Sequence, residues 1–314
     1  MPAAIQFCMD SDIGWELYRS YLSVLQEGSL SAAARALGVA QPTLGRHIAA
    51  LEKSLGLTLF TRSHLGLMPT EAALALKSYA EDMSTTATAM KRAAESQGSG
   101  VKGTVRITAS EVIGVEVLPA IVAQLQIEHP ALRIELVLTN RVQDLLRREA
   151  DIAVRMTAPR QDQLIARRVG QVELGFHAHQ TYLRERGVPR SLDDLTQHSL
   201  IGFDTETPFL RAARKALPLW HRDAFTFRTD SDLGQLALIR SGAGIGICQV
   251  VLAKRDSQLV RVLPRQFSFD LETWLTMHED LRHSPRCKVT FDALLAGLQR
   301  HVPPVRRSRS GSGQ

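Results

Sequence analysis

Apolar residues recur at helical spacing in the first third of the chain, and they predict three helices in close succession. The first helix covers about residues 13–27, and Gly28 ends it. The second is short, and we expect Ser31 to cap its start and Gly38 to end it through a positive φ. The third begins near Pro42, because a fixed φ and a missing N–H suit a first helical turn. The apolar faces consist of Trp15, Leu17, Tyr18, Tyr21, Leu22 and Leu25, then of Ala32, Ala33, Ala36 and Leu37, and then of Leu44, Ile48 and Leu51.

Two short strands and a long helix should follow. Residues 55–70, LGLTLFTRSHLGLMPT, are typical of two strands around a turn, which would form a wing beside the helices. Thr70 then caps a helix of about two dozen residues. This helix carries a stripe of small residues. Because a lone exposed helix would be poorly stable, packing against another helix is favoured.

Beyond residue 103, segments typical of strands and helices alternate. The run QGSGVKG, residues 97–103, has the composition of a flexible hinge and marks a domain boundary. The strands VRITA, RIELVL and DIAVR are separated by a helix after Glu111, with Pro119 near its start, and by a helix at 142–148. This order calls for a parallel sheet. Further strands are predicted at 164–169, 173–178, 200–203, 224–229, 244–248 and 258–262, and further helices at 232–241, 250–255 and 285–300.

Residues 13–95 resemble the LysR-type transcriptional regulators in order and spacing. The shared motif is A-x-x-L-G-V-x-Q-P-x-L-x-R-x-I-x-x-L-E-x-x-L-G-x-x-L-F-x-R, which continues to Gly66 and to the run PTEAA at 69–73. Two short helices joined by a glycine turn also describe a DNA-binding helix-turn-helix. A plain helical hairpin is the alternative, but the motif runs on through a wing into a long helix, which favours the DNA-binding interpretation.

The resemblance implies an α/β protein with an N-terminal winged helix-turn-helix, a long linker helix and a two-lobed effector domain like a periplasmic binding protein. In the family the linker helix pairs antiparallel with its partner to make a dimer, and tetramers are usual. We therefore expect a DNA-binding domain at 13–70, a linker helix at 71–96, the hinge at 97–103, an effector domain at 104–300 and a disordered tail at 301–314. Lobe 1 would cover about 104–173 and 275–300, and lobe 2 about 174–274.

Charge and cysteine content narrow the interpretation. The net charge is +6, and the motif itself is basic, since Arg35, Arg46, Lys53 and Arg62 stand against Glu52 alone within residues 31–70. A local basic surface is expected where DNA phosphates bind.

The chain has no apolar run long enough to span a bilayer and no signal peptide, so we expect a cytoplasmic protein with no membrane partner. The cysteines are far apart, which favours buried free thiols over a disulfide framework or zinc site; they are Cys8, Cys248 and Cys287.

The candidate DNA contacts lie at the start of the third helix, which would enter the major groove. Arg46 can pair bidentately with guanine and Gln41 with adenine, and Pro42 and Thr43 offer apolar contacts to a thymine methyl. His47 faces the same groove. Ser31, Arg62 and His64 would hold phosphates and set the register. The family usually has serine where Gly45 stands and often glutamine at His47, and Gly45 should weaken the helix by up to about 1 kcal/mol relative to alanine.

The candidate effector contacts lie where strands of the second domain end. Ligands of two-lobed open sheets bind between the lobes, at the carboxyl ends of strands and at helix N-termini. Ser110 matches the family's ligand-contacting hydroxyl position. Arg155 would suit a carboxylate ligand, whereas Glu111 and Asp204 argue for an amine or a neutral polar ligand, and both alternatives stay open. The remaining candidates are Val112, Thr139, Asn140, Phe203, Asp230 and Ser231.

Signatures of enzymes are missing from the sequence. The run SGAGIG, residues 241–246, looks like a nucleotide loop, but its glycines follow a helix and lead into a strand, so we interpret it as a turn. We find no P-loop, no metal-spaced histidines and no G-x-S-x-G elbow, and we expect no catalytic residues, metal or cofactor. The expected partners are double-stranded DNA, a small-molecule effector, further copies of the chain and RNA polymerase. Two other classes compete: a binding protein or enzyme whose N-terminal helices only dimerise, and a nucleoid-type DNA binder without a ligand.

Overall fold

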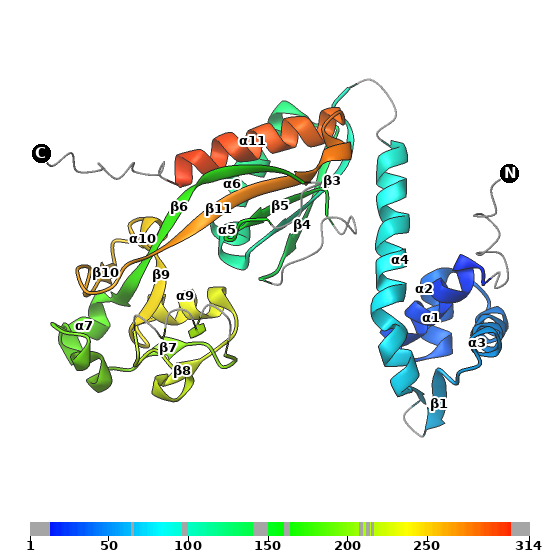
Figure 1. The fold of residues 1–314 in the computed structure, drawn as a ribbon, viewed down its shortest axis with the longest axis horizontal. Coiled ribbons are helices and arrows are strands. Elements are labelled where there is room, and N and C mark those ends of the chain that lie inside the picture. The colour runs from blue at the N-terminus through cyan, green and yellow to red at the C-terminus, as the bar shows by residue number, and fades with distance from the viewer. Residues whose placement is uncertain are drawn as a thin grey trace, which may run out of the picture. The chain divides into compact units, whose positions relative to one another are not determined.

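The computed structural model describes residues 13–63, 66–95, 100–140, 150–159, 164–206, 210–211, 214 and 217–302. The chain divides into two compact units, Met1–Lys91 and Arg92–Gln314, and each is considered by itself (Figure 1). The helix predicted at 142–148 lies outside the described residues, as do residues 97–99 of the predicted hinge and residues 303–314 of the predicted tail. Within the described ranges, no helix is both long and apolar enough to cross a membrane.

The first unit is a winged helix-turn-helix followed by a long helix. Its elements are α1 (Trp15–Glu27), α2 (Leu30–Leu37), α3 (Gln41–Leu55), β1 (Phe60–Ser63), β2 (Gly66–Pro69) and α4 (Glu71–Glu95). Gly38 ends α2 with a φ of 68°, as predicted, and β1 and β2 form the expected antiparallel pair. The predicted cap was wrong by two residues: Ser29, not Ser31, precedes α2, and its hydroxyl accepts the N–H of Ala32 at 3.2 Å.

A small core holds this unit together. Leu44, Ile48 and Leu51 of α3 are buried, as their spacing predicted, and they pack with Tyr21 of α1. Tyr21 is only 1% exposed and its hydroxyl donates to the carbonyl of Ala73 in α4, so this ring belongs to the core. Burial, together with the nearby Glu81, raises the pKa of Tyr21 to about 12.

Polar side chains fix the wing and the start of α4. The Glu52 carboxylate accepts the backbone N–H groups of Leu59 and Phe60 at 2.7 and 3.2 Å, so the one acid of the basic motif anchors the wing. Thr70 caps α4 as predicted, because its hydroxyl accepts the N–H of Ala73.

The second unit is built on one seven-stranded mixed sheet. Its strands are β3 (Gly103–Ala109), β4 (Leu132–Leu138), β5 (Ile152–Arg155), β6 (Leu164–His179), β9 (Gly246–Gln249), β10 (Leu259–Arg261) and β11 (Phe269–His278). The order is β10-β6-β11-β5-β3-β4, with β9 also paired to β6. As predicted, β3 runs parallel to both β4 and β5.

Two features of this sheet differ from the prediction. The strands expected at 164–169 and 173–178 are one continuous strand, β6, and β11 was not predicted at all. Residues 164–174 of β6 pair antiparallel with β11, and both strands run from one lobe into the other (Figure 1). The predicted lobe limits near 173 and 275 therefore fall inside strands that both lobes share.

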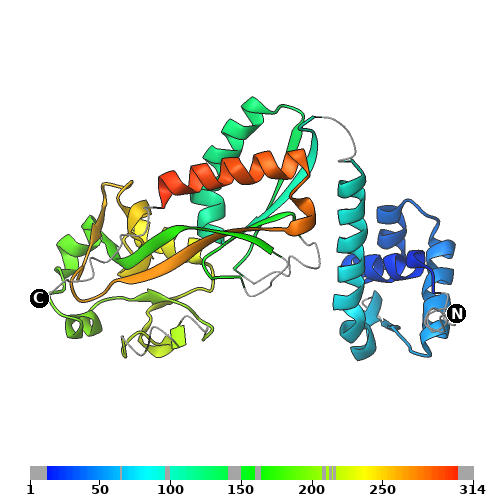
Figure 2. The ribbon, with the colours of Figure 1, turned by 45° about the horizontal axis from the view of Figure 1, so that its top comes forward.

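Helices complete the two lobes (Figure 2). In lobe 1, α6 (Leu118–Glu128) and α11 (Pro285–His301) pack together over a core of aliphatic residues, and α5 (Glu111–Glu116) precedes α6. The α11 helix extends to His301, so it continues one residue into the segment predicted as a tail. Lobe 2 contains α7 (Gln180–Arg186), α9 (Asp232–Arg240), α10 (Val250–Ala253) and the short parallel pair β7 (Ile201–Gly202) and β8 (Phe227–Arg228). Its core is aromatic, with Phe176 and Trp220 in contact at its centre.

Candidate functional sites

The start of α3 presents a polar, exposed surface. Gln41, Pro42 and Arg46 are exposed, and Thr43 is half-buried. Ser31 donates to the Oε1 of Gln41 at 3.0 Å, which ties α2 to the first residue of α3. Arg46 donates to the Thr43 hydroxyl at 3.3 Å. Five of the eight predicted DNA contacts thus lie together around one helix end, where side chains and unpaired N–H groups face outward.

His47 is held differently from its neighbours. Its ring is half-buried, and its Nδ1 lies 2.8 Å from the Ser20 hydroxyl of α1. One ring nitrogen is therefore engaged inside the unit, and only the other can reach a partner outside it. Gly45, one turn into α3, has open space where a Cβ would stand, so its lack of a side chain is not required by packing.

The two wing candidates remain predictions. The backbone of Arg62 pairs with Leu67 in the β1–β2 ladder. His64 lies outside the described residues.

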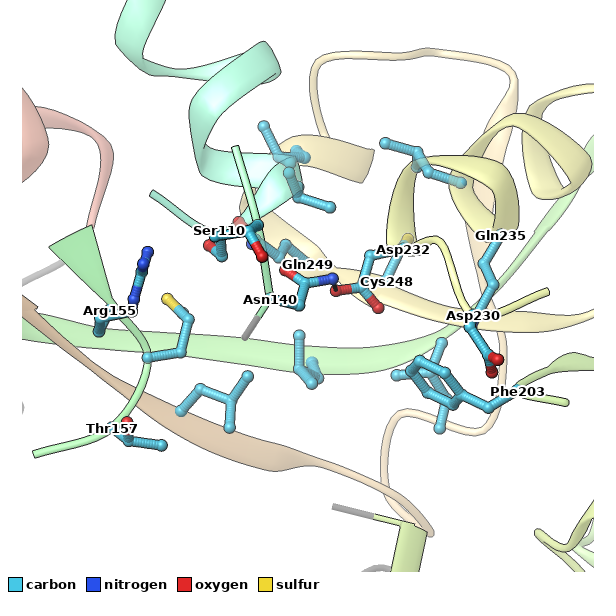
Figure 3. Close-up of a pocket in the computed structure, with 18 of the residues that line it drawn as sticks. Ser110, Asn140, Arg155, Thr157, Phe203, Asp230, Asp232, Gln235, Cys248 and Gln249 are labelled. Atoms are coloured by element: carbon cyan, nitrogen blue, oxygen red, sulfur yellow. Dashed lines mark hydrogen bonds between the residues drawn. The ribbon is translucent and has the colours of Figure 1, made fainter. Parts of the chain in front are cut away.

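A cavity of about 470 Å³ lies between the lobes of the second unit, and it unites most of the predicted effector contacts (Figure 3). Lobe 1 and lobe 2 both supply lining residues, from the ends of strands and the starts of helices as expected. The predicted residues that line it are Ser110, Val112, Thr139, Asn140, Arg155, Phe203 and Asp230.

The other three predicted effector contacts do not line this cavity, because their side chains make contacts beside it. Ser231 caps α9 and donates to the Oε2 of Glu111 at 2.8 Å, joining the lobes. Asp204 forms an ion pair with Arg222 at 2.7 Å. These three residues therefore order the cavity's surroundings.

Much of the lining was missed from the sequence. Gln249 follows a predicted strand directly, and Asp232 opens a predicted helix, so the rule used for the other candidates could have found both. The same holds for Met156, which follows the strand DIAVR. Most of the other apolar residues gave no such signal, because they lie within strands and helices. The missed residues are Met156, Thr157, Leu174, Trp220, Asp232, Gln235, Leu236, Ile247, Cys248, Gln249, Leu252 and Leu271.

Side chains bridge the lobes next to the cavity. The Oδ1 of Asn140 accepts the N–H of Glu111 at 3.1 Å, and its Nδ2 donates to Asp232 at 2.8 Å. At the other ends of α5 and α9, Arg240 donates to both carboxylate oxygens of Glu116, at 2.6 and 3.2 Å. This hydrogen bond lowers the pKa of Glu116.

Burial sets the protonation of two cavity groups. It raises the pKa of Asp232 to about 6, and the neighbouring Glu111 carboxylate adds to the shift. It also raises the pKa of the Cys248 thiol to about 12, so the thiol stays protonated at neutral pH and is a poor nucleophile. Cys287 is buried too.

The run at 241–246 is a turn, as predicted: it follows α9, has Gly242 at a φ of 77°, and leads into β9.

Comparison with known proteins covers both units. Residues 15–74 match the family model of the bacterial regulatory helix-turn-helix protein, lysR family, and residues 98–299 match that of the LysR substrate binding domain. An HTH-type transcriptional regulator of Xanthomonas campestris is 27% identical over 57% of this chain, which spans about half (52%) of that relative's length. The HTH-type transcriptional activator AaeR of Escherichia coli is 25% identical over 78% of this chain and 81% of its own. Full-length CbnR, solved with its target DNA, has a TM-score of 0.63 at 18% identity, covering 90% of this chain and 99% of that one.

Proposed function

The chain belongs to the lysR family of bacterial helix-turn-helix regulators, and we propose that it binds inverted-repeat promoter sites as a dimer under the control of a small molecule held between its lobes. DNA-binding regulation of transcription and a LysR-type substrate-binding domain follow from the family. The residues, the symmetry of the DNA site and the location of the effector are our proposal. The protein acts as a regulator and not as an enzyme, and it works in the cytoplasm, where promoter DNA lies.

The exposed start of α3 is the observation that supports DNA reading most strongly. Arg46 reads guanine and Gln41 reads adenine, while Pro42 and Thr43 contact a thymine methyl. Ser31, Arg62 and His64 hold phosphates. His47 has a smaller part in base contact, because Ser20 engages one of its ring nitrogens. Pairing of two chains along α4 sets two reading helices on half-sites one helical turn, or a multiple of it, apart. Dimers then assemble into tetramers.

The cavity supports control by an effector, since both lobes line it and polar bridges join them beside it. A ligand that favours one arrangement of the lobes shifts the population of the assembled protein toward that arrangement. The coupled change alters the spacing of the DNA-binding units and the contact with RNA polymerase, so that effector and DNA affect each other's affinity.

Gel shifts with the full chain test this function. We expect binding to DNA from upstream of its own gene to survive excess unrelated competitor DNA, and to weaken steeply with salt as counterions are released. Equal binding to both DNAs would favour a nucleoid-type binder. Ser110→Ala should change the response to an added effector and leave promoter binding intact, and an unchanged response would remove Ser110 from the effector site.

A further inference from the structure

Two carboxylates lie close together at one wall of the interlobe cavity: Asp232 lines this wall, and Glu111 lies beside it. Glu111 is the first residue of α5 and Asp232 the first of α9, and the bonds through Asn140 and Ser231 bring these helix starts together. Both of these bonding partners, an amide and a hydroxyl, are neutral. In the described part of the chain, neither carboxylate forms an ion pair.

The helix starts offset only part of this negative charge. A helix N-terminus carries about half a positive elementary charge. Even if both α5 and α9 contribute fully, about one net negative charge remains at this wall. The cost of the charged form is greatest at Asp232, because burial removes water that would otherwise solvate the carboxylate.

A residue that lines the same cavity carries a hydrogen-bond acceptor without a partner. Gln249, at the end of β9, is only 7% exposed, and its buried Oε1 has no partner in the described structure. Both Gln249 and Asp232 line the cavity (Figure 3). A buried acceptor without a partner is costly, so a ligand that brings an N–H donor to it gains affinity.

The remaining wall accommodates an apolar body. Aliphatic and aromatic side chains line it, among them Leu236, Ile247 and Trp220. Among the described residues that line the cavity, Arg155 is the one cationic side chain. It is held on lobe 1, where its guanidinium donates to the Thr108 hydroxyl at 2.7 Å and to the Val154 carbonyl at 3.1 Å. The volume of about 470 Å³ is in the range of small-ligand sites.

From these observations we propose that the effector is a protonated amine on a largely apolar body, and that its ammonium group pairs with Asp232 while an N–H reaches Gln249. The proposal rests on the function proposed above, since it names the chemistry of the ligand that the cavity takes. It resolves the choice between a carboxylate and an amine in favour of the amine.

Three probes with one apolar body test the proposal on the full chain at pH 8: 3-phenylpropan-1-amine, 3-phenylpropan-1-ol and 3-phenylpropanoate. Their dissociation constants are measured from Tm shifts and tryptophan fluorescence. We expect the amine to bind roughly tenfold more tightly than the alcohol, because a charge-assisted hydrogen bond is stronger than a neutral one. The carboxylate should bind most weakly.

Variants then locate the preference. Asp232→Asn keeps an acceptor for Asn140 and should bring the amine down to the affinity of the alcohol. Gln249→Leu should weaken amine binding severalfold. The control is Asp223→Asn, which removes a carboxylate that is 84% exposed on lobe 2 and should leave the order of the probes unchanged. If a variant fails to fold, the order measured on the unaltered chain still decides.

Two results would overturn the proposal: tighter binding of the carboxylate than of the amine, or no binding of the amine. Neither result would contradict the proposed function as long as gel shifts still show promoter binding. Conversely, an amine preference in a chain without promoter binding would refute the function and leave the cavity chemistry standing.

Discussion

The two functional regions of this protein are built in opposite ways. The proposed DNA-reading surface comes from one short stretch of chain, at the exposed start of α3, with Ser31 and Gln41 bonded to each other across the turn. The cavity gathers side chains from Ser110 to Leu271, out of both lobes. A surface formed by neighbours in sequence depends on the local helix, whereas a cavity formed by distant segments depends on how two lobes meet.

The largest effect should come from removing the core beneath the reading helix. Leu44 is fully buried at the centre of the first unit, so Leu44→Ala should lower that unit's free energy of unfolding by about 2–5 kcal/mol. Calorimetry of the full chain would show the unfolding transition of the first unit at a lower temperature and that of the second unit unchanged. A downward shift of both would mean that the two units unfold together.

The stability of the protein should depend on pH through the buried carboxylate of Asp232. The pKa of Asp232 is raised to about 6 in the folded protein. The folded protein is therefore more stable at a pH below the pKa that Asp232 has in the unfolded chain, and this stability is lost as the pH rises through about 6. The polar groups that act on Asp232 are the Glu111 carboxylate and the Asn140 amide. Asp232→Asn should therefore raise Tm at pH 8 and give no gain at pH 4, relative to the unaltered chain. An equal gain at both pH values would contradict a charge effect.

Variants at His47 and Gln41 should distinguish a side chain of α3 that stabilises the fold from one that contacts DNA bases. Its hydrogen bond to Ser20 is internal, so His47→Ala should lower the free energy of unfolding by about 1 kcal/mol. Gln41→Ala, at an exposed position, should cost little stability and weaken binding to the promoter site. Denaturant unfolding and gel shifts on both variants make the comparison, and the reverse pattern would exchange the two roles.

The smallest effect is a gain at Gly45. A Cβ there meets open space, and alanine is the better helix former, so Gly45→Ala should add up to about 1 kcal/mol to the free energy of unfolding. Denaturant midpoints would detect it. A loss of stability would show that the flexibility of this position matters to the fold.

The sequence was most informative where structure is local. Gly38, the spacing from Leu44 to Leu51 and the Thr70 cap follow from rules that act within a few residues, and all three are confirmed. The exception, a cap placed at Ser31, arose because Ser29 and Ser31 both suit a helix start. A cap depends on the backbone conformation and not on residue type alone.

Sequence was least informative where distant segments meet. The continuity of β6 and the existence of β11 depend on their pairing with each other across the two lobes. Likewise Trp220 lies in no regular element and reaches the cavity wall through the aromatic core of lobe 2. The rule that ligands bind at strand ends and helix starts found seven cavity residues, because it depends on the order of elements along the chain. No comparable rule identifies cavity residues that lie inside strands.

The central claim is that α3 reads DNA sequence, and the ratio of promoter to non-promoter affinity tests it most directly. The ratio is measured by gel shift at one salt concentration for the unaltered chain, for Arg46→Ala, and for Lys288→Ala as a control that removes an exposed cation of α11. We predict that Arg46→Ala loses about 1–3 kcal/mol of discrimination, a fall of roughly 5- to 150-fold in the ratio, while dimerisation and the control are unaffected. Full site preference in Arg46→Ala would contradict the assignment of α3 as the reading helix.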